Sequence, residues 1–155
     1  MIASAQLAND FTKVPRKTTM FKPEVRSLLD SPLVARLSVI DRGGYPHTVP
    51  LWFDVDGDDI VMISDRNTRK VAFLASNPKA SICIGGGEGA DGEAGPGYLF
   101  KGQCTTEEDP GYAWLRKITL RYRSPAQAEK DIEQWRTQLD IMVIRLTVAK
   151  VIKVY

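Results

Sequence analysis

The chain has 155 residues, enough for one domain with a buried core. Its formal net charge is +2 and it lacks a long basic run, so its composition gives no reason to expect a nucleic-acid partner. It shows neither an apolar run of membrane-spanning length nor the basic start and long apolar core of a secretory signal. Cys83 and Cys104 both fall in predicted strands, and we expect a cytoplasmic protein with reduced thiols.

Short strands dominate the predicted elements. Alternating or β-branched apolar residues between turn residues predict six strands, at Leu33–Ile40, Pro46–Val55, Ile60–Ile63, Ala80–Ile84, Tyr98–Thr106 and Ile141–Tyr155. The last strand is predicted to be broken at Thr147–Lys150. Tight turns join the first three strands, which indicates an antiparallel meander. We therefore predict a mainly β fold with a few helices, closed into an antiparallel barrel because closure removes exposed edges.

Helices are predicted between and after these strands, at Lys22–Asp30, Arg69–Ser76, Asp109–Arg123 and Ala126–Leu139. The period of the third helix predicts a packed side made of Tyr112, Leu115, Ile118, Leu120 and Tyr122. Ser124 and Pro125 supply the cap and the first turn of the fourth helix. Residues 1–21 show no clear period and are predicted to form an N-terminal arm, with the domain at 22–155.

The segment Ile60–Ala80 carries the strongest functional pattern. It predicts a strand, a short polar loop and a helix that begins after Thr68 as its N-cap. Thr68, Arg69 and Lys70 add a hydroxyl, a guanidinium and an ammonium to the free N–H groups of a helix start, which suits a phosphate dianion. A capped, solvated helix start has the same residues, so the segment alone leaves both interpretations open.

A proline interrupts the strand that precedes this segment. Pro50 has no backbone N–H, so the strand around it must lie at an edge or a bulge. Backbone groups beside Pro50 are then free to bind the edge of a planar heterocycle, although an edge proline also protects against aggregation. The turn at Asp56-Gly57 connects this strand to Ile60–Ala80, so a ring site and a phosphate site would lie on adjacent strands.

Other motifs give weaker indications of chemistry. The segment Gly85–Gly97 contains a dinucleotide-binding glycine pattern twice, but a predicted strand follows it and its acidic residues repel phosphate, so we interpret it as a hairpin loop. His47 is the only histidine and the two cysteines lack metal-ligand spacing, so we predict no metal site. No acid–base or nucleophile motif stands out, and the catalytic residues stay unidentified.

Three ordered motifs resemble the pyridoxamine 5′-phosphate oxidase-like superfamily of flavin-binding split barrels. They are GGYPHTVPLWF, MISDRNTRKVAFLASNPKASICI and IMVIRLTVAKVIKVY. The second is similar to the family's strand–loop–(Ser/Thr)-Arg-Lys–helix–Asn-Pro–strand unit and is the most specific of the three. The resemblance covers roughly Leu28 to Tyr155 and implies a six-stranded antiparallel split β-barrel.

The resemblance also implies a cofactor site in a groove between the subunits of a homodimer. Arg69 and Lys70 match the pair that grips the cofactor phosphate, and the strand from His47 to Leu51 matches the one that borders the isoalloxazine ring. Late-helix residues are expected to complete the site from the other subunit. The predicted cofactor-binding residues are His47, Thr48, Val49, Pro50, Leu51, Ser64, Asp65, Thr68, Arg69, Lys70, Trp114 and Tyr122.

Two departures argue against pyridoxamine 5′-phosphate oxidase itself. The family's glutamine at the start of the fifth strand corresponds to about Gly97 here, and the oxidase's Arg- and His-rich C-terminal segment has no counterpart before Tyr155. The Pro50–Phe53 turn and the short ending look more like the subgroup that includes deazaflavin-dependent reductases.

We therefore predict a homodimeric oxidoreductase that transfers hydride through FMN, or through a deazaflavin coenzyme, to a small-molecule substrate. The alternative is a non-catalytic flavin- or haem-binding storage protein of the same fold, in which His47 is the only imidazole for iron. We expect neither a nucleic-acid nor a membrane partner. The sequence does not identify the substrate.

Overall fold

The computed structural model describes residues 19–87 and 92–154. The strands are β1 (Ala35–Ile40), β2 (Pro46–Leu51), β3 (Phe53–Asp56), β4 (Asp59–Asp65), β5 (Lys79–Gly85), β6 (Gly97–Glu107) and β7 (Ile141–Lys153). The helices are α1 (Pro23–Leu29), α2 (Arg69–Ser76), α3 (Ala113–Tyr122) and α4 (Pro125–Gln138), with a 3₁₀ turn, η1 (Pro110–Tyr112), before α3.

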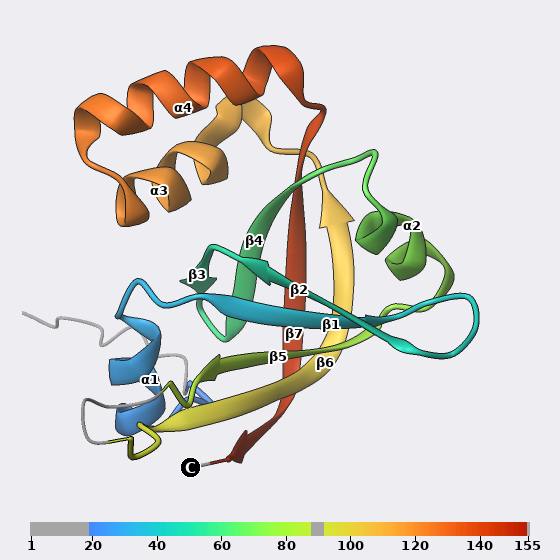
Figure 1. Cartoon of the computed structure of the whole chain (residues 1–155), viewed down its shortest axis with the longest axis vertical. Coiled ribbons are helices and arrows are strands. Elements are labelled where there is room, and N and C mark those ends of the chain that lie inside the picture. Colours follow the sequence, from blue (N-terminus) through green and yellow to red (C-terminus); the bar gives the residue numbers. More distant parts are fainter. Residues whose placement is uncertain (1–18, 88–91, 155) are drawn as a thin grey trace, which may run out of the picture.

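One curled antiparallel sheet forms the body of the molecule, with the strand order β2-β1-β5-β6-β7-β4-β3 (Figure 1). The two end strands, β2 and β3, are consecutive in the chain and are separated only by Trp52. One stretch of chain therefore pairs with β1 through β2 and with β4 through β3. The predicted split barrel is confirmed, but the predicted strand Pro46–Val55 is interrupted at Trp52, which gives seven strands instead of six in the described ranges.

The order of strands also confirms the inference from Pro50, because β2 lies at an end of the sheet. The β1–β2 hairpin turns through Gly44, whose φ of 84° is in the left-handed region that glycine tolerates. The predicted hairpin loop between β5 and β6 is confirmed as well, because these strands pair antiparallel up to Gly85 and Gly97. The dinucleotide-binding context of strand, loop and helix is therefore absent at this position.

The strand β4 is buried on both faces, which explains its continuous apolar sequence. Ile60 and Met62 point into the core inside the sheet, whereas Val61 and Ile63 pack against the helices on the other face. A hairpin of α3 and α4 covers that outer face (Figure 1). The residues that join the hairpin to the sheet are Leu115, Ile118, Ala128, Ile132, Ile141 and Val143.

The helix α1 and the residues before it close one end of the core. Val25 and Leu29 of α1 are buried in the main cluster. Phe21, the last residue of the predicted arm, is also buried, with its ring edge-on to Phe100 at 5.7 Å between centroids. Residues 1–18 of the predicted arm lie outside the described residues.

The predicted helix Asp109–Arg123 begins later in the structure, at Ala113, and turns a different face toward the sheet. Gly111 and Tyr112 have φ values of 65° and 56°, so the chain turns out of helical geometry before α3 begins. Asp109 accepts hydrogen bonds from the backbone N–H groups of Trp114 and Leu115, both at 2.9 Å, and caps the new helix. The predicted packed side is wrong at Tyr112 and Leu120, which are 36% and 43% exposed.

The strand β7 is continuous across the predicted break at Thr147–Lys150, so that prediction is wrong, but these residues contain an irregularity. Lys101 pairs with Lys150 and Gly102 pairs with Val148, so the pairing skips Ala149. A side chain at Gly102 would place its Cβ 2.0 Å from the Thr147 carbonyl oxygen. The close approach of β6 to β7 therefore requires glycine at this position.

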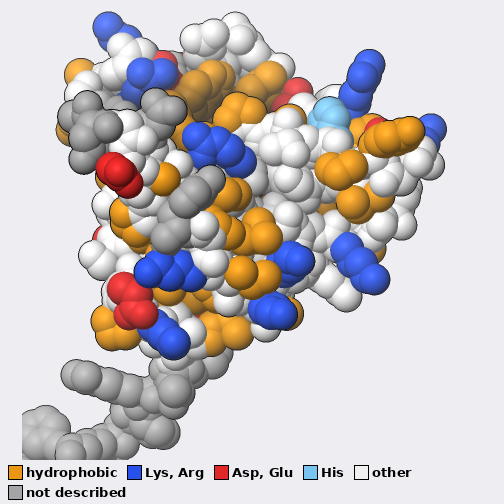
Figure 2. All heavy atoms as spheres, turned by 60° about the horizontal axis from the view of Figure 1, so that its bottom comes forward, with side chains coloured by type: hydrophobic (Ala, Val, Ile, Leu, Met, Phe, Trp, Pro, Cys, Tyr) orange, Lys and Arg blue, Asp and Glu red, His pale blue; other side chains and the backbone are white. Residues whose placement is uncertain are grey.

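Charged side chains are spread over the surface of the described residues. Figure 2 shows Lys and Arg side chains scattered among hydrophobic ones, with a few acidic groups, on the face at the bottom of Figure 1. One charged cluster centres on Arg145 of β7, which is within 2.8 Å of both Glu107 and Asp56 and 3.3 Å of Asp59. In the described ranges, no helix is long and apolar enough to cross a membrane.

The tight contact at Gly102 predicts a large effect of one methyl group. We expect Gly102→Ala to lower the free energy of unfolding by about 1–3 kcal/mol or more, because backbone strands must separate to admit the Cβ. Gly87→Ala is the control, since a Cβ there meets no atom within 4 Å. Urea denaturation of both variants measures the difference, and equal stability of the two would contradict the contact.

Candidate functional site

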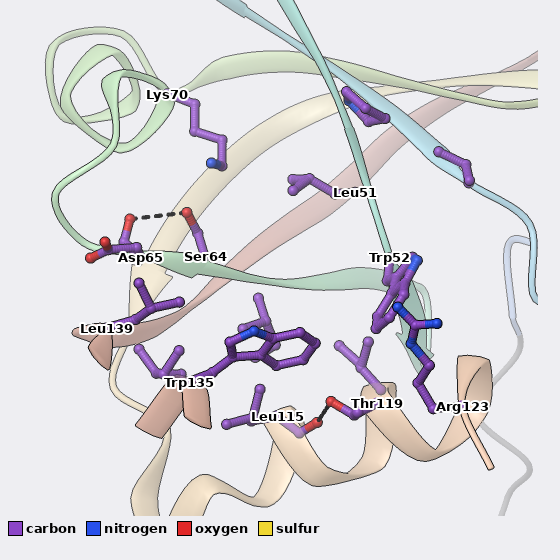
Figure 3. A pocket seen from close by; sticks show the side chains of 15 residues that line it. Leu51, Trp52, Ser64, Asp65, Lys70, Leu115, Thr119, Arg123, Trp135 and Leu139 are labelled. Carbon is purple, nitrogen blue, oxygen red and sulfur yellow. Dashed lines mark hydrogen bonds between the residues drawn. The ribbon is translucent and has the colours of Figure 1, made fainter. Parts of the chain in front are cut away.

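A cavity of about 510 Å³ lies between the sheet and the α3–α4 hairpin (Figure 3). This volume is typical of small-molecule sites, which range over about 300–1,000 Å³. Its apolar lining consists of Val34, Pro50, Leu51, Trp52, Ile63, Leu115, Ile118, Trp135, Leu139 and Ile141. Its polar lining consists of Ser64, Asp65, Lys70, Thr119 and Arg123.

The two cations of the lining lie at opposite ends of the cavity. Lys70 comes from the first turn of α2, whereas Arg123 directly follows α3, and Trp135 lies between them in Figure 3. Ser64 and Asp65, at the end of β4, lie near the Lys70 end. The cavity therefore has an apolar middle with a positive group at each end.

Aromatic rings form one wall of the cavity. The Trp52 ring stacks on Tyr122 at 4.9 Å with an interplanar angle of 3°, and it meets Trp135 edge-on at 6.0 Å. These ring contacts make the wall apolar and fix the orientation of Trp52.

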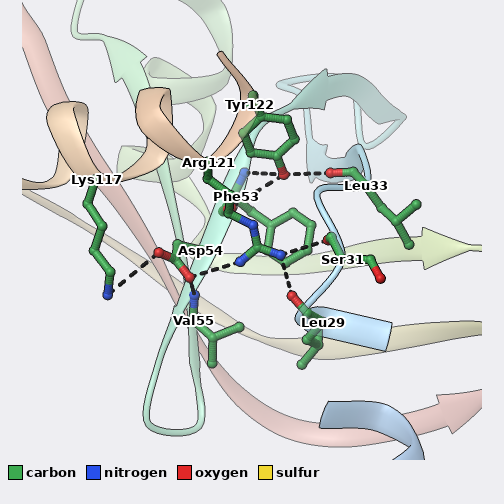
Figure 4. Close-up of polar contacts among 9 residues, drawn as sticks. All are labelled: Leu29, Ser31, Leu33, Phe53, Asp54, Val55, Lys117, Arg121 and Tyr122. Carbon is green, nitrogen blue, oxygen red and sulfur yellow. Dashed lines mark hydrogen bonds and ion pairs between the residues drawn. The ribbon is translucent and has the colours of Figure 1, made fainter. Parts of the chain in front are cut away.

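Hydrogen bonds from α3 fix the chain on both sides of Trp52 (Figure 4). The Tyr122 hydroxyl donates to the Leu33 carbonyl at 2.6 Å and accepts from the Phe53 N–H at 3.2 Å. Arg121 donates to the Asp54 carboxylate at 2.9 Å and to the backbone carbonyl of Ser31 at 2.7 Å. Because these groups are only partly exposed, the connection between β2 and β3 is held rigidly against α3.

The start of α2 has no side-chain cap, which corrects the prediction for Thr68. Thr68 does occupy the N-cap position, but its hydroxyl donates to the Asp65 carbonyl at 2.9 Å and accepts nothing from the helix. The first turn of α2 also lacks acidic residues. The backbone N–H groups of this first turn form the positive end of the helix dipole. They have no side-chain acceptor and are therefore available to an anion.

Lys70 is the half-buried cation of this helix start. Burial lowers the pKa of Lys70 below the ordinary lysine value, and the nearby Asp65 carboxylate opposes that shift. Among the residues that the structure describes, no carboxylate lies within 4.0 Å of the Lys70 ammonium. Arg69, its neighbour, is exposed and does not line the cavity.

The structure brings five of the predicted cofactor-binding residues to the cavity: Pro50, Leu51, Ser64, Asp65 and Lys70. The others have different surroundings in this chain. His47 packs edge-on against Phe73 at 5.3 Å, and Thr48 shares a hydrogen bond of 2.8 Å with Ser38. Val49 packs against the core inside the sheet, while Trp114 lies under the Lys117 ammonium, 4.7 Å away.

The sequence did not predict that Trp52, Arg123 and Trp135 line the cavity. Trp52 falls inside one of the three recognised motifs, but nothing in the motif shows that its ring faces the helices. The period of the fourth predicted helix marks Trp135 only as apolar, and Arg123 has no pattern around it. These residues meet because α3 and α4 fold back over β4, which is a tertiary contact.

Two further residues limit the chemistry of the molecule. A side chain at Gly97 would place its Cβ 2.7 Å from the backbone nitrogen of Gly86, so no glutamine fits at this position. Burial raises the pKa of the Cys104 thiol to about 12, which keeps it protonated and unreactive at neutral pH. In the described part of the chain, no three metal-ligating side chains come together.

Comparisons with known proteins agree with this architecture. A conserved hypothetical protein from Mycobacterium tuberculosis has a TM-score of 0.69 at 20% identity, covering 92% of this chain and 89% of that one. An F420 reductase has a TM-score of 0.63 at 20% identity, over 82% and 94% of the two chains. A heme binding protein from Mycobacterium smegmatis has a TM-score of 0.64 at 22% identity, over 83% and 51%. A search of curated protein sequences found no match.

At these identities, the solved structures show a shared fold only. The family assignment comes from the sequence itself, because residues 21–155 match the family model of pyridoxamine 5′-phosphate oxidase. This range includes the whole described sheet and every residue that lines the cavity. The chain therefore belongs to the pyridoxamine 5′-phosphate oxidase family.

Proposed function

We propose that this protein is an oxidoreductase that binds a phosphorylated flavin-type cofactor in the cavity between the sheet and the α3–α4 hairpin. The observation that carries the proposal is Lys70, a half-buried ammonium that lines an apolar cavity without a carboxylate partner among the described residues. Burial of this charge is unfavourable, and the Asp65 carboxylate, which is more than 4.0 Å away, offsets that cost only in part. A phosphate dianion would offset that cost.

The surroundings of Lys70 fit a phosphate. The uncapped first turn of α2 supplies backbone N–H groups and the positive end of a dipole. Ser64 lies at the same end, and its hydroxyl is within 3.2 Å of the Thr68 hydroxyl. The backbone N–H groups would hold the phosphate by charge-assisted hydrogen bonds, while Lys70 neutralises its charge. The Ser64 hydroxyl donates to the Asp65 carbonyl at 3.0 Å and would turn from it to reach the phosphate.

The middle of the cavity fits the ring of such a cofactor. Trp135 provides apolar surface, and Pro50 and Leu51 bring the edge of β2 to the same place. When bound, a flavin-type ring supplies the hydride chemistry, and the chain supplies position and exclusion of water. Because the ring would supply the chemistry, the chain needs no acid–base motif, and none stands out in the sequence.

FMN is the first choice of cofactor, and a deazaflavin coenzyme is the second. The fold shared with an F420 reductase supports the deazaflavin choice. The crowded backbone at Gly97 supports a reductase-like member of the family over pyridoxamine 5′-phosphate oxidase itself, since the oxidase's glutamine does not fit there. The homodimer and the cytoplasmic location stay predictions from the sequence.

A haem-binding or storage role is the alternative, supported by the fold shared with a heme binding protein. His47 is the only histidine in the chain, and its ring packs on Phe73 outside the cavity. A haem in this cavity would therefore lack an imidazole ligand from His47. A haem absorption band that disappears in His47→Ala would favour the alternative.

The proposal predicts that Lys70→Met weakens cofactor binding by about 10- to 100-fold, since a hydrogen bond to a charged group contributes about 1.5–3 kcal/mol. The matched control is Lys150→Met, which removes the same charge from an exposed position on β7. Titration with FMN and with deazaflavin coenzyme, followed by fluorescence, measures both affinities. Wild-type affinity in Lys70→Met, or failure of the wild type to bind either cofactor, would contradict the proposal.

The lowered pKa of Lys70 predicts a dependence of cofactor affinity on pH. The phosphate needs the ammonium form, so affinity is full below the folded-state pKa of Lys70 and falls as pH rises through it. Since that pKa is lower than the ordinary lysine value, the loss should begin at a lower pH than an exposed lysine would give. Lys70→Arg should keep its affinity at higher pH, and the same pH profile for both proteins would argue against Lys70 as the phosphate ligand.

A further inference from the structure

The cavity has a second cation that a phosphate at the Lys70 end does not use. Arg123 lies at the opposite end, and in Figure 3 the side chains of Leu51 and Trp135 lie between the two cations. The Arg123 side chain is 46% exposed, so this end of the cavity opens to solvent. Arg123 and Trp52 both line the cavity and contact each other there.

The Arg123 guanidinium contacts two neighbours, a carboxylate and an aromatic ring. Its Nε lies 3.3 Å from the Asp131 carboxylate, and Cζ, the central carbon of the guanidinium, lies 5.1 Å from the centroid of the Trp52 ring. Asp131 is itself held, because its other oxygen accepts a hydrogen bond from the Gln127 side-chain amide at 2.7 Å. These contacts keep the guanidinium beside the Trp52 ring, although the buried Asp131 oxygen that faces Nε makes no hydrogen bond.

The terminal nitrogens of Arg123 are left available by these contacts. Asp131 is reached through Nε, and no hydrogen-bond acceptor for the two terminal nitrogens exists among the described residues. An arginine fork with free terminal N–H groups binds a carboxylate or phosphate through two parallel hydrogen bonds. The apolar surface of Trp52 beside it reduces competition from water.

We propose that Arg123 determines the substrate specificity of the cavity by binding an anionic group of the substrate. The substrate class is a small molecule with a carboxylate or phosphate on Arg123 and an apolar or planar body against Trp52. The inference rests on the proposed function, because the cofactor ring is taken to fill the middle of the cavity with its phosphate at Lys70. Asp131 acts through Arg123 as a positioning residue.

The test compares Arg123→Gln with Arg116→Gln. Arg116 also joins α3 to α4 by an ion pair, with Glu129, and is similarly exposed, but it does not line the cavity. The probes are benzoate and benzamide, which have nearly the same shape and differ in charge. They are titrated into protein loaded with whichever of FMN or deazaflavin coenzyme it binds, and the change in cofactor absorbance reports binding.

We expect the wild type and Arg116→Gln to bind benzoate at least tenfold more tightly than benzamide. Arg123→Gln should lose this preference and keep the wild-type affinity for the cofactor. A preference retained in Arg123→Gln, or absent from the wild type, would overturn the inference and leave the cofactor site standing.

Two other results are also decisive. A tenfold loss of cofactor affinity in Arg123→Gln would assign this arginine to the cofactor and overturn its role with the substrate. If the wild type binds neither cofactor, the proposed function fails, and the two probes are followed by tryptophan fluorescence of the free protein. Equal binding of benzoate and benzamide there would reject the anion site as well.

Discussion

The passage of the chain through Trp52 is the constraint on which the rest of the structure depends. Before Trp52 the chain pairs with β1 as β2, and after Trp52 it pairs with β4 as β3. The sheet therefore curls around its core. The Tyr122 hydroxyl holds this passage by bonding to Leu33 on one side and Phe53 on the other. The same hydrogen bonds fix α3, and with it the wall of the cavity. Closure of the sheet and formation of the site therefore have one structural cause.

Local patterns predicted the elements well where local chemistry decides them. The bounds of α2 match the prediction, because Pro78 and the polar loop punctuate the sequence at both ends. The prediction that the Thr68 side chain caps α2 was wrong because its hydroxyl is turned toward the Asp65 carbonyl, to which it donates, and accepts no N–H of the first turn. The interruption at Trp52 was missed because alternation shows which residues face inward, not which strand each half pairs with.

The cavity likewise contains residues that local motifs predict and residues that only tertiary contacts bring there. Motifs on β2, β4 and α2 predicted the residues at one side of the cavity, including Lys70 and Pro50. The opposite side comes from α3 and α4, whose apolar residues signal burial without showing what they face. Arg123 could not be found from the sequence, since its position depends on Asp131 and on the Trp52 ring, which come from different elements. Residues supplied by tertiary contacts are thus the ones that the sequence left unassigned.

The central claim is that a phosphorylated ring cofactor occupies the cavity with its phosphate at the start of α2. The most direct measurement is a crystal structure of the protein with FMN, or with the deazaflavin coenzyme if that binds more tightly. We expect the phosphate within hydrogen-bond distance of the Lys70 ammonium and the ring against Trp135, between Lys70 and Arg123. A cofactor bound elsewhere, for example on the outer surface beside His47, would contradict it.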